Sequence, residues 1–322
     1  MSTIDIASPR QRSKAVGAYW NVLFVALAAA LLIAPMLLYP VFLMKALCFA
    51  LFACAANLLI GYIGLLSVGQ GMFLGTASYV TAYSAKDLGF PVEFAVLAGT
   101  AAATLLGVAT GYLSIRRQGM YFAMITLALS QLVYFIYVRS PFTGGENGIQ
   151  QVPRGYLFGF IDLGNDLTLY YVIAVIFMAC FLLVFRIIHS PFGQVVKAIR
   201  ENETRVVSLG YKPAHYKLIL FVIAAAMSGL AGSLKAIVFQ LASLSDVTWG
   251  MSGEVVLMTL LGGVGTVFGP LVGAFMLTTI EFLLSRLNAW LVLAQGIIFI
   301  VCVLVFRRGV VGELSRIFKK PL

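Results

Sequence analysis

Residues 253–285 read GEVVLMTLLGGVGTVFGPLVGAFMLTTIEFLLS. This apolar run of 33 residues is well beyond the ~20 residues that one helix needs to cross a bilayer. Its middle contains four glycines and a proline between Gly262 and Pro270, residue types that interrupt helices. We therefore predict two shorter helical elements joined by irregular backbone.

The rest of the chain has the same apolar character. Of its 322 residues, 61% are hydrophobic and 11% are charged, whereas a soluble domain has ~25% charged residues. This excludes a soluble enzyme, a nucleic-acid-binding domain and a disordered chain. The other apolar runs span residues 19–38, 41–60, 64–85, 92–114, 119–138, 167–188, 216–240 and 288–306. We predict an all-α, polytopic transmembrane bundle with about ten membrane-embedded elements, some of them discontinuous.

Basic residues give the expected orientation, because cytoplasmic loops collect Lys and Arg. Three lie in the N-terminal tail, two at 116–117, five at 189–217 and five after Phe306. All four regions are predicted to be cytoplasmic, which requires 253–285 to supply two elements. The expected organisation is a tail at 1–18, a transmembrane domain at 19–306 and a tail at 307–322. The net charge of +10 thus follows from topology and indicates no nucleic-acid partner.

A second glycine-rich stretch, at 61–75, resembles the broken segment. Interrupted helices at matching places in two halves are typical of inverted repeats in transporters, so an inverted repeat is a hypothesis. Irregular backbone in a membrane lines cavities or is buried. The predicted translocation-pathway residues are Ser67, Gln70, Thr76, Ser252, Glu254 and Thr266. The alternatives are that the glycines serve close helix packing and that Glu254 caps a helix.

Catalytic and metal-binding signatures are absent from the sequence. The two histidines, His189 and His215, flank the 189–217 loop, and no HExxH, GxSxG or phosphate-binding loop occurs. We predict no enzyme activity, no cofactor and no metal. Lys45 and Lys235 lie about five residues from predicted outer helix ends, where long basic side chains snorkel to the interface.

The loop at 190–213 has an apolar face and a charged face, as in an amphipathic helix pair ending at Gly210. A helix lying in the lipid interface and a docking helix for a cytoplasmic protein both fit this pattern. The predicted docking residues are Lys197, Arg200, Glu201, Glu203, Arg205 and Gly210.

Several motifs carry a family resemblance. They are SPFG at 190–193, AIRENE at 198–203, GYIGLLSVGQ at 61–70, SGE at 252–254 and LGGVGT at 261–266, followed by Gly269-Pro270. In this order they resemble the branched-chain amino acid ABC transporter permeases, specifically the M-type (LivM-like) subunit.

The resemblance implies a multi-pass protein of the bacterial inner membrane with both termini cytoplasmic. It also implies partners: a second homologous permease, two ATPase subunits and a periplasmic substrate-binding protein. The 198–210 region is then the coupling helix, although Thr204-Arg205-Val206 stands where importers commonly have Glu-Ala-Ala. Related permeases handle urea, short amides or aromatic acids, so these cargoes stay open. An ion-coupled secondary transporter is the further alternative, and it would be expected to have more ionisable residues at mid-span.

Overall fold

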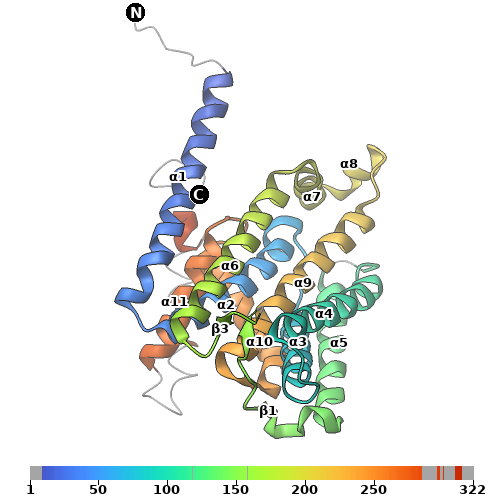
Figure 1. Ribbon diagram of the computed structural model, residues 1–322. Coiled ribbons are helices and arrows are strands. Elements are labelled where there is room, and N and C mark those ends of the chain that lie inside the picture. The colour runs from blue at the N-terminus through green and yellow to red at the C-terminus, as the bar shows by residue number, and fades with distance from the viewer. Residues whose placement is uncertain are drawn as a thin grey trace, which may run out of the picture.

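The computed structural model describes residues 9–117, 119–157, 159–284, 296–297, 300 and 309–313. Helices dominate this part of the chain, which confirms the all-α fold (Figure 1). Five of the described helical segments are long and apolar enough to cross a membrane. The longer helices are α1 (Pro9–Leu37), α2 (Pro40–Asn57), α4 (Val92–Ser114), α5 (Met120–Arg139), α6 (Asp166–His189) and α9 (Pro213–Phe239). The shorter ones are α3 (Gln70–Lys86), α7 (Pro191–Glu201), α8 (Glu203–Ser208), α10 (Trp249–Gly262) and α11 (Gly269–Leu284).

The run at 253–285 is broken as predicted. Helix α10 ends at Gly262 and α11 begins at Gly269. Between them, Gly263 and Gly265 have φ angles of 123° and 79°, a region that favours glycine. The chain therefore turns back here, and α10 packs against α11.

The first glycine-rich stretch breaks later than predicted. A gap was expected at 61–63, but α2 continues through a π-helix, η1 (Leu58–Ile63). The irregular backbone starts at Gly64, whose φ is 78°, and lasts until α3 begins at Gln70. The sequence interpretation missed this because a π-helix keeps the same apolar composition as an α-helix.

One further predicted boundary differs from the structure, and two predicted segments lie largely outside the described residues. Helix α1 begins at Pro9, inside the segment predicted as a tail. The predicted span at 288–306 and the tail at 307–322 lie largely outside the described residues.

Helices α2 and α3 form the centre of the molecule. Fourteen residues of α2 and fourteen of α3 are buried. Helix α3 packs against α4 and α9, and α2 packs against α6, α9 and α11. Small residues permit this closeness: a Cβ at Gly75 would lie 2.9 Å from the Val247 amide nitrogen. Helices α4, α5 and α6 surround this centre and expose apolar side chains outward, as a lipid-facing surface requires.

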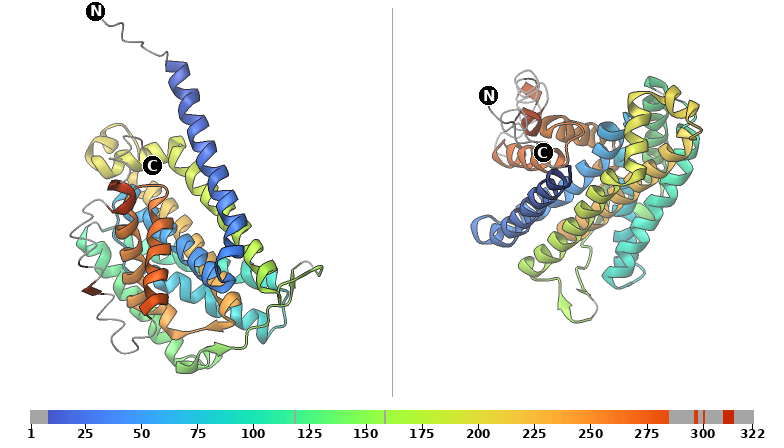
Figure 2. Two further views of the ribbon diagram at one scale, coloured as in Figure 1. Left: turned by 90° about the vertical axis from the view of Figure 1, so that its left-hand side faces the viewer. Right: turned by 90° about the horizontal axis from the view of Figure 1, so that it is seen from above.

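The two ends of the molecule differ in structure. At one end lie the start of α1 and the helices α7 and α8 (Figures 1 and 2). The opposite end carries short irregular elements: η2 (Pro141–Thr143), η3 (Gly145–Asn147), β1 (Ile149–Gln150), β2 (Tyr156–Leu157), β3 (Ile161–Asp162), β4 (Leu241–Ala242) and η4 (Leu244–Val247). Strand β1 pairs antiparallel with β4, and β2 pairs antiparallel with β3. The β1–β4 pair fastens the long 140–165 connection to the end of α9, and the β2–β3 pair lies within that connection.

Candidate functional site

A row of buried, uncharged polar groups begins where α3 starts. Ser67 and Gln70 each expose 1% of their surface. The Gln70 Oε1 accepts a hydrogen bond of 2.8 Å from Ser228 of α9. Within the described structure, the Gln70 Nε2 and the Ser67 Oγ have no hydrogen-bond partner. Two of the predicted pathway residues are thus buried with unused hydrogen-bonding capacity.

Helix α5 supplies polar groups that face Val68 and Tyr79, whereas Gln70 faces α9. Its buried stripe includes Thr126, Ser130 and Tyr137. Thr126 Oγ1 accepts a hydrogen bond of 3.3 Å from the Val68 amide, and the Tyr137 ring stacks on Tyr79 of α3 at 5.0 Å. Ser130 lies between these two contacts along the stripe, and it is fully buried.

Several buried polar atoms on and near α3 and α5 have no hydrogen-bond partner among the described residues. In the described chain, the Ser130 Oγ and the Tyr79 hydroxyl lack hydrogen-bond partners, as do the two atoms at Ser67 and Gln70. Thr76, another predicted pathway residue, is buried on the same helix as Tyr79. We call Ser67, Gln70, Thr76, Tyr79 and Ser130 the polar seam. A buried polar group without a partner costs about 1–3 kcal/mol, so these atoms suit water or a polar cargo.

The other three predicted pathway residues lie elsewhere. Ser252 of α10 accepts a hydrogen bond of 2.8 Å from the Gly71 amide and thereby satisfies the start of α3. Thr266 caps α11, because its Oγ1 accepts a hydrogen bond of 3.1 Å from the Gly269 amide. The sequence interpretation selected these two residues because they are polar and lie near glycines. In the structure their hydroxyl oxygens accept hydrogen bonds from backbone amides at the starts of α3 and α11.

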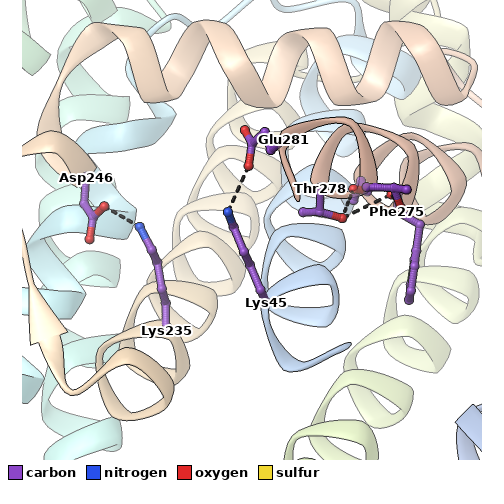
Figure 3. Close-up of polar contacts among 8 residues, drawn as sticks. Lys45, Lys235, Asp246, Phe275, Thr278 and Glu281 are labelled. Atoms are coloured by element: carbon purple, nitrogen blue, oxygen red, sulfur yellow. Dashed lines mark hydrogen bonds and ion pairs between the residues drawn. The ribbon is translucent and has the colours of Figure 1, made fainter. Parts of the chain in front are cut away.

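Glu254 lies near a cluster of charged side chains close to η4, of which Figure 3 shows Lys45 with Glu281 and Lys235 with Asp246. It is half-buried on α10 and lies within hydrogen-bonding reach of Glu281 of α11. Glu281 accepts a hydrogen bond of 2.9 Å from Lys45 of α2, and Lys235 of α9 pairs with Asp246. Both lysines lie over the Phe49 ring, at 5.7 and 5.5 Å from its centroid. Each ammonium group thus binds a carboxylate, which the sequence did not predict, and snorkelling of Lys45 and Lys235 to the interface stays a prediction.

The 190–213 loop forms two short helices, as predicted. Ser190 caps α7 by accepting from the Gly193 amide at 3.2 Å, and Asn202 caps α8 by accepting from the Arg205 amide at 3.0 Å. The apolar face of the pair packs inward through Val196, Ile199 and Val206. Gly210 follows α8 with a φ of 85°, which a chain reversal after a helix favours.

Three of the predicted docking side chains contact the transmembrane helices, although that of Arg200 is also exposed. Arg200 donates to the carbonyl oxygen of Gly61, and Lys197 lies 5.8 Å from the centroid of the Tyr62 ring. Glu203 binds Lys217 of α9 with both carboxylate oxygens, at 2.8 and 2.7 Å. These contacts fasten α7 and α8 to the transmembrane helices.

The remaining predicted docking residues, Glu201, Arg205 and Gly210, are exposed. Close to them in sequence are three exposed apolar side chains that the sequence interpretation did not select. These are Val207, Leu209 and Tyr211, with 53%, 70% and 44% of their surface exposed. We call these six residues the docking face.

Asn57 is a site residue that the sequence interpretation missed. Its Nδ2 donates to the Thr266 carbonyl oxygen and its Oδ1 accepts from the Gly265 amide, each at 2.9 Å. Ser130 and Tyr79 were missed as well. A polar residue within an apolar run was the available signal for Asn57, but its partners are about two hundred positions away in sequence.

No group of three or more His, Cys, Asp or Glu residues that could hold a metal ion occurs within the described ranges.

Comparison with known proteins identifies relatives. Residues 38–306 match the family described as "Branched-chain amino acid transport system / permease component". The chain is 30% identical over 265 residues to the high-affinity branched-chain amino acid transport system permease protein LivM of Escherichia coli K12, covering 74% of this chain and 62% of that protein. The LivM protein of Salmonella typhimurium LT2 is 30% identical over 267 residues, with the same coverage. The ribose import permease protein RbsC of Bacillus subtilis 168 is 30% identical over 183 residues, or 52% of this chain and 53% of that protein.

The chain thus spans about 62% of the length of the two LivM relatives. No solved structure matches the chain.

Proposed function

Because the chain belongs to the family of branched-chain amino acid transport permease components, we propose that it forms half of the pathway of an ATP-driven importer. The cargo is a branched-chain or related amino acid. A second homologous permease, two ATPase subunits and a periplasmic substrate-binding protein complete the system. The family match over 38–306 carries this proposal, and three features of the structure support it.

The first feature is the distribution of basic residues. Arg116 lines a surface hollow with His215 at the start of α9, so the 116–117 turn and the α7–α8 loop share one end. The start of α1 is at that end (Figure 1). Gly309 also packs there, since a Cβ on it would clash with Gly263. This end is the cytoplasmic one in our proposal, by the positive-inside rule.

The second feature is the polar seam, whose residues lie on α3, on α5 and in the segment just before α3. Its groups are uncharged, so they can hydrogen-bond the polar groups of an amino acid without trapping it in a strong ion pair. Buried apolar residues around the seam, such as Phe122 and Met72, suit an aliphatic side chain. We propose that cargo passes along this seam and that the soluble binding protein supplies most of the selectivity.

The third feature is the docking face. Exposed apolar side chains at the centre of a patch with charges around it are typical of protein interfaces. We propose that an ATPase subunit binds here, with Leu209 at the centre of contact and Glu201 and Arg205 setting the register. ATP binding and hydrolysis would then move α7 and α8 as a rigid body and alternate access to the seam.

The experiment is ATP-driven uptake in a reconstituted system. The chain is co-purified with the second permease and the ATPase subunits and placed in lipid vesicles together with the binding protein. Labelled leucine, isoleucine and valine should enter only with hydrolysable ATP. Urea, a short amide and an aromatic amino acid are the comparison cargoes, and preference for one of them would reassign the cargo. Uptake by this chain alone, driven by an ion gradient, would overturn the proposal.

A further inference from the structure

Three segments that are distant in sequence meet at the end of the molecule that carries α7. They are the end of α2 with η1, the irregular segment 263–268 between α10 and α11, and helix α7. Asn57 connects the first two through its hydrogen bonds of 2.9 Å to the Gly265 amide and the Thr266 carbonyl oxygen. Arg200 connects α7 to the first through the Gly61 carbonyl oxygen.

The backbones of these segments touch directly. A Cβ placed on Gly61 would lie 2.6 Å from the Gly265 amide nitrogen, closer than real Cβ contacts. One placed on Gly265 would lie 3.4 Å from the Arg200 guanidinium. The α10–α11 break is therefore pressed against η1 and Arg200, with no long flexible side chain in between.

The irregular backbone of the 263–268 segment needs hydrogen bonds from side chains. Buried backbone groups outside regular helices require other partners, and Asn57 supplies a donor and an acceptor to two adjacent residues of the break. A π-helix also disturbs the usual helical bonding pattern and is frequent at functional sites. The guanidinium of Arg200 provides a charged donor to one carbonyl of η1, and charged donors form the stronger hydrogen bonds.

Helix α7 is held to η1 by further contacts. Lys197 lies over the Tyr62 ring, and Val196 and Ile199 of α7 are buried. Displacement of α7 would therefore carry η1 with it, and η1 bears directly on the break. Close-packed contacts of this kind transmit small shifts because packed interiors deform little.

We propose that Arg200, Gly61, Asn57 and Gly265 form a joint that transmits movement of α7 to the break between α10 and α11. Arg200 and Asn57 are positioning residues in this joint. This inference rests on the proposed function, since it is the ATPase subunits that would move α7.

The test uses the complete complex in vesicles and the variants Asn57→Ala and Arg200→Ala. Three quantities are measured: retention of the ATPase subunits, ATP hydrolysis, and leucine taken up per ATP hydrolysed. We expect uptake per ATP to fall about tenfold, within the usual range of coupling effects, while retention and hydrolysis stay near those of the unaltered complex. Arg200→Lys keeps a cation but not the planar donor and should recover part of the coupling.

Two control variants match the substitutions. Asn165→Ala removes another asparagine that accepts a backbone hydrogen bond, from Leu167 at 3.0 Å, at the opposite end of the molecule. Gly253→Ala adds a methyl group where no atom lies within 4 Å, whereas Gly61→Ala forces one into the joint. The controls should keep normal coupling, and Gly61→Ala should lose it.

The outcomes separate the joint from the proposed function. Normal uptake per ATP in both Asn57→Ala and Arg200→Ala overturns the joint, as does a loss of uptake that merely parallels loss of the ATPase subunits. If Asn57→Ala does not fold, the surface substitution Arg200→Ala decides. An unaltered complex without ATP-driven uptake overturns the proposed function instead.

Discussion

Asp246 is a buried carboxylate that pairs with Lys235. Its side chain is 2% exposed, and that of Lys235 is 14% exposed. Removing one member of a buried ion pair leaves a charge that has lost both water and its partner, at a cost of about 3–5 kcal/mol. Lys45 and Glu281 are more exposed, at 33% and 17%, so their pair matters less to stability. The pair of Lys235 and Asp246 fastens η4 to the end of α9.

The substitution Lys235→Met should therefore destabilise the protein by about 3–5 kcal/mol, because Asp246 stays buried without its cation. Thermal unfolding of the purified protein in detergent measures the effect. The double variant Lys235→Met with Asp246→Asn removes both charges and should recover most of the lost stability. An equally unstable double variant would contradict the ion-pair explanation.

Single residues also mark the limit of what the sequence could predict. Ser67, Gln70 and Thr76 were selected because they are polar residues beside helix-breaking glycines, and the structure buries all three. Ser252 and Thr266 were selected for the same reason, but they satisfy helix ends. Asn57 was missed because its partners belong to a segment far along the chain. Local pattern identifies polar groups in a membrane, while tertiary contacts decide which of them are left unpaired.

At the scale of elements, α7 and α8 have two faces with different chemistry. The inner face is fastened by Arg200, Lys197 and Glu203, and the outer face exposes Val207 and Leu209. The sequence interpretation expected the charged residues to make the docking contacts. The geometry assigns several of these charges to attachment, so apolar contact becomes the better candidate for binding a partner.

Shortening an apolar side chain on the outer face tests whether apolar contact binds the partner. Leu209→Ala should weaken retention of the ATPase subunits at least ~10-fold, because central apolar anchors contribute about 2 kcal/mol or more. Glu201→Ala removes an exposed rim charge and should have a much smaller effect. Retention is measured by co-purification of the ATPase subunits with each variant over a series of ATPase concentrations, and the two variants are compared. A larger loss for Glu201→Ala than for Leu209→Ala would contradict the apolar docking face.

The positions of the elements themselves were largely predictable. Apolar runs of about twenty residues gave α4, α5, α6 and α9 within a few residues of their observed ends, because burial in lipid requires such runs. The break at Gly263 followed from the helix-interrupting residues there. The prediction failed for η1, where the helix continues in altered form to Ile63, because composition does not distinguish a π-helix from an α-helix.

At the scale of the whole molecule, charge and shape agree on two distinct ends. One end has α7, α8 and the basic turns, and the other has the strands β1 to β4 (Figure 1). The two ends define the direction of transport in our proposal. They also make orientation measurable without any assay of uptake.

Single cysteines at the two ends should respond oppositely to a membrane-impermeant maleimide applied to intact cells. Ser208→Cys lies on the end proposed as cytoplasmic and should react only after the membrane is opened. Phe160→Cys replaces a side chain that is 93% exposed at the other end and should react at once. The unaltered chain measures the background from its native cysteines, of which Cys48 and Cys54 are buried. Immediate reaction of Ser208→Cys would reverse the orientation.

At the contact between η1 and the α10–α11 break, Gly61 lies against Gly265 and the Asn57 side chain bonds to Gly265 and Thr266. Side chains elsewhere in the bundle can therefore change over evolutionary time without altering it, provided that the two glycines and Asn57 are kept. The residues of the polar seam lie on α3, on α5 and in the segment just before α3. After gene duplication, substitutions along the seam could therefore change which solute is transported, while the joint that transmits movement of α7 stays the same.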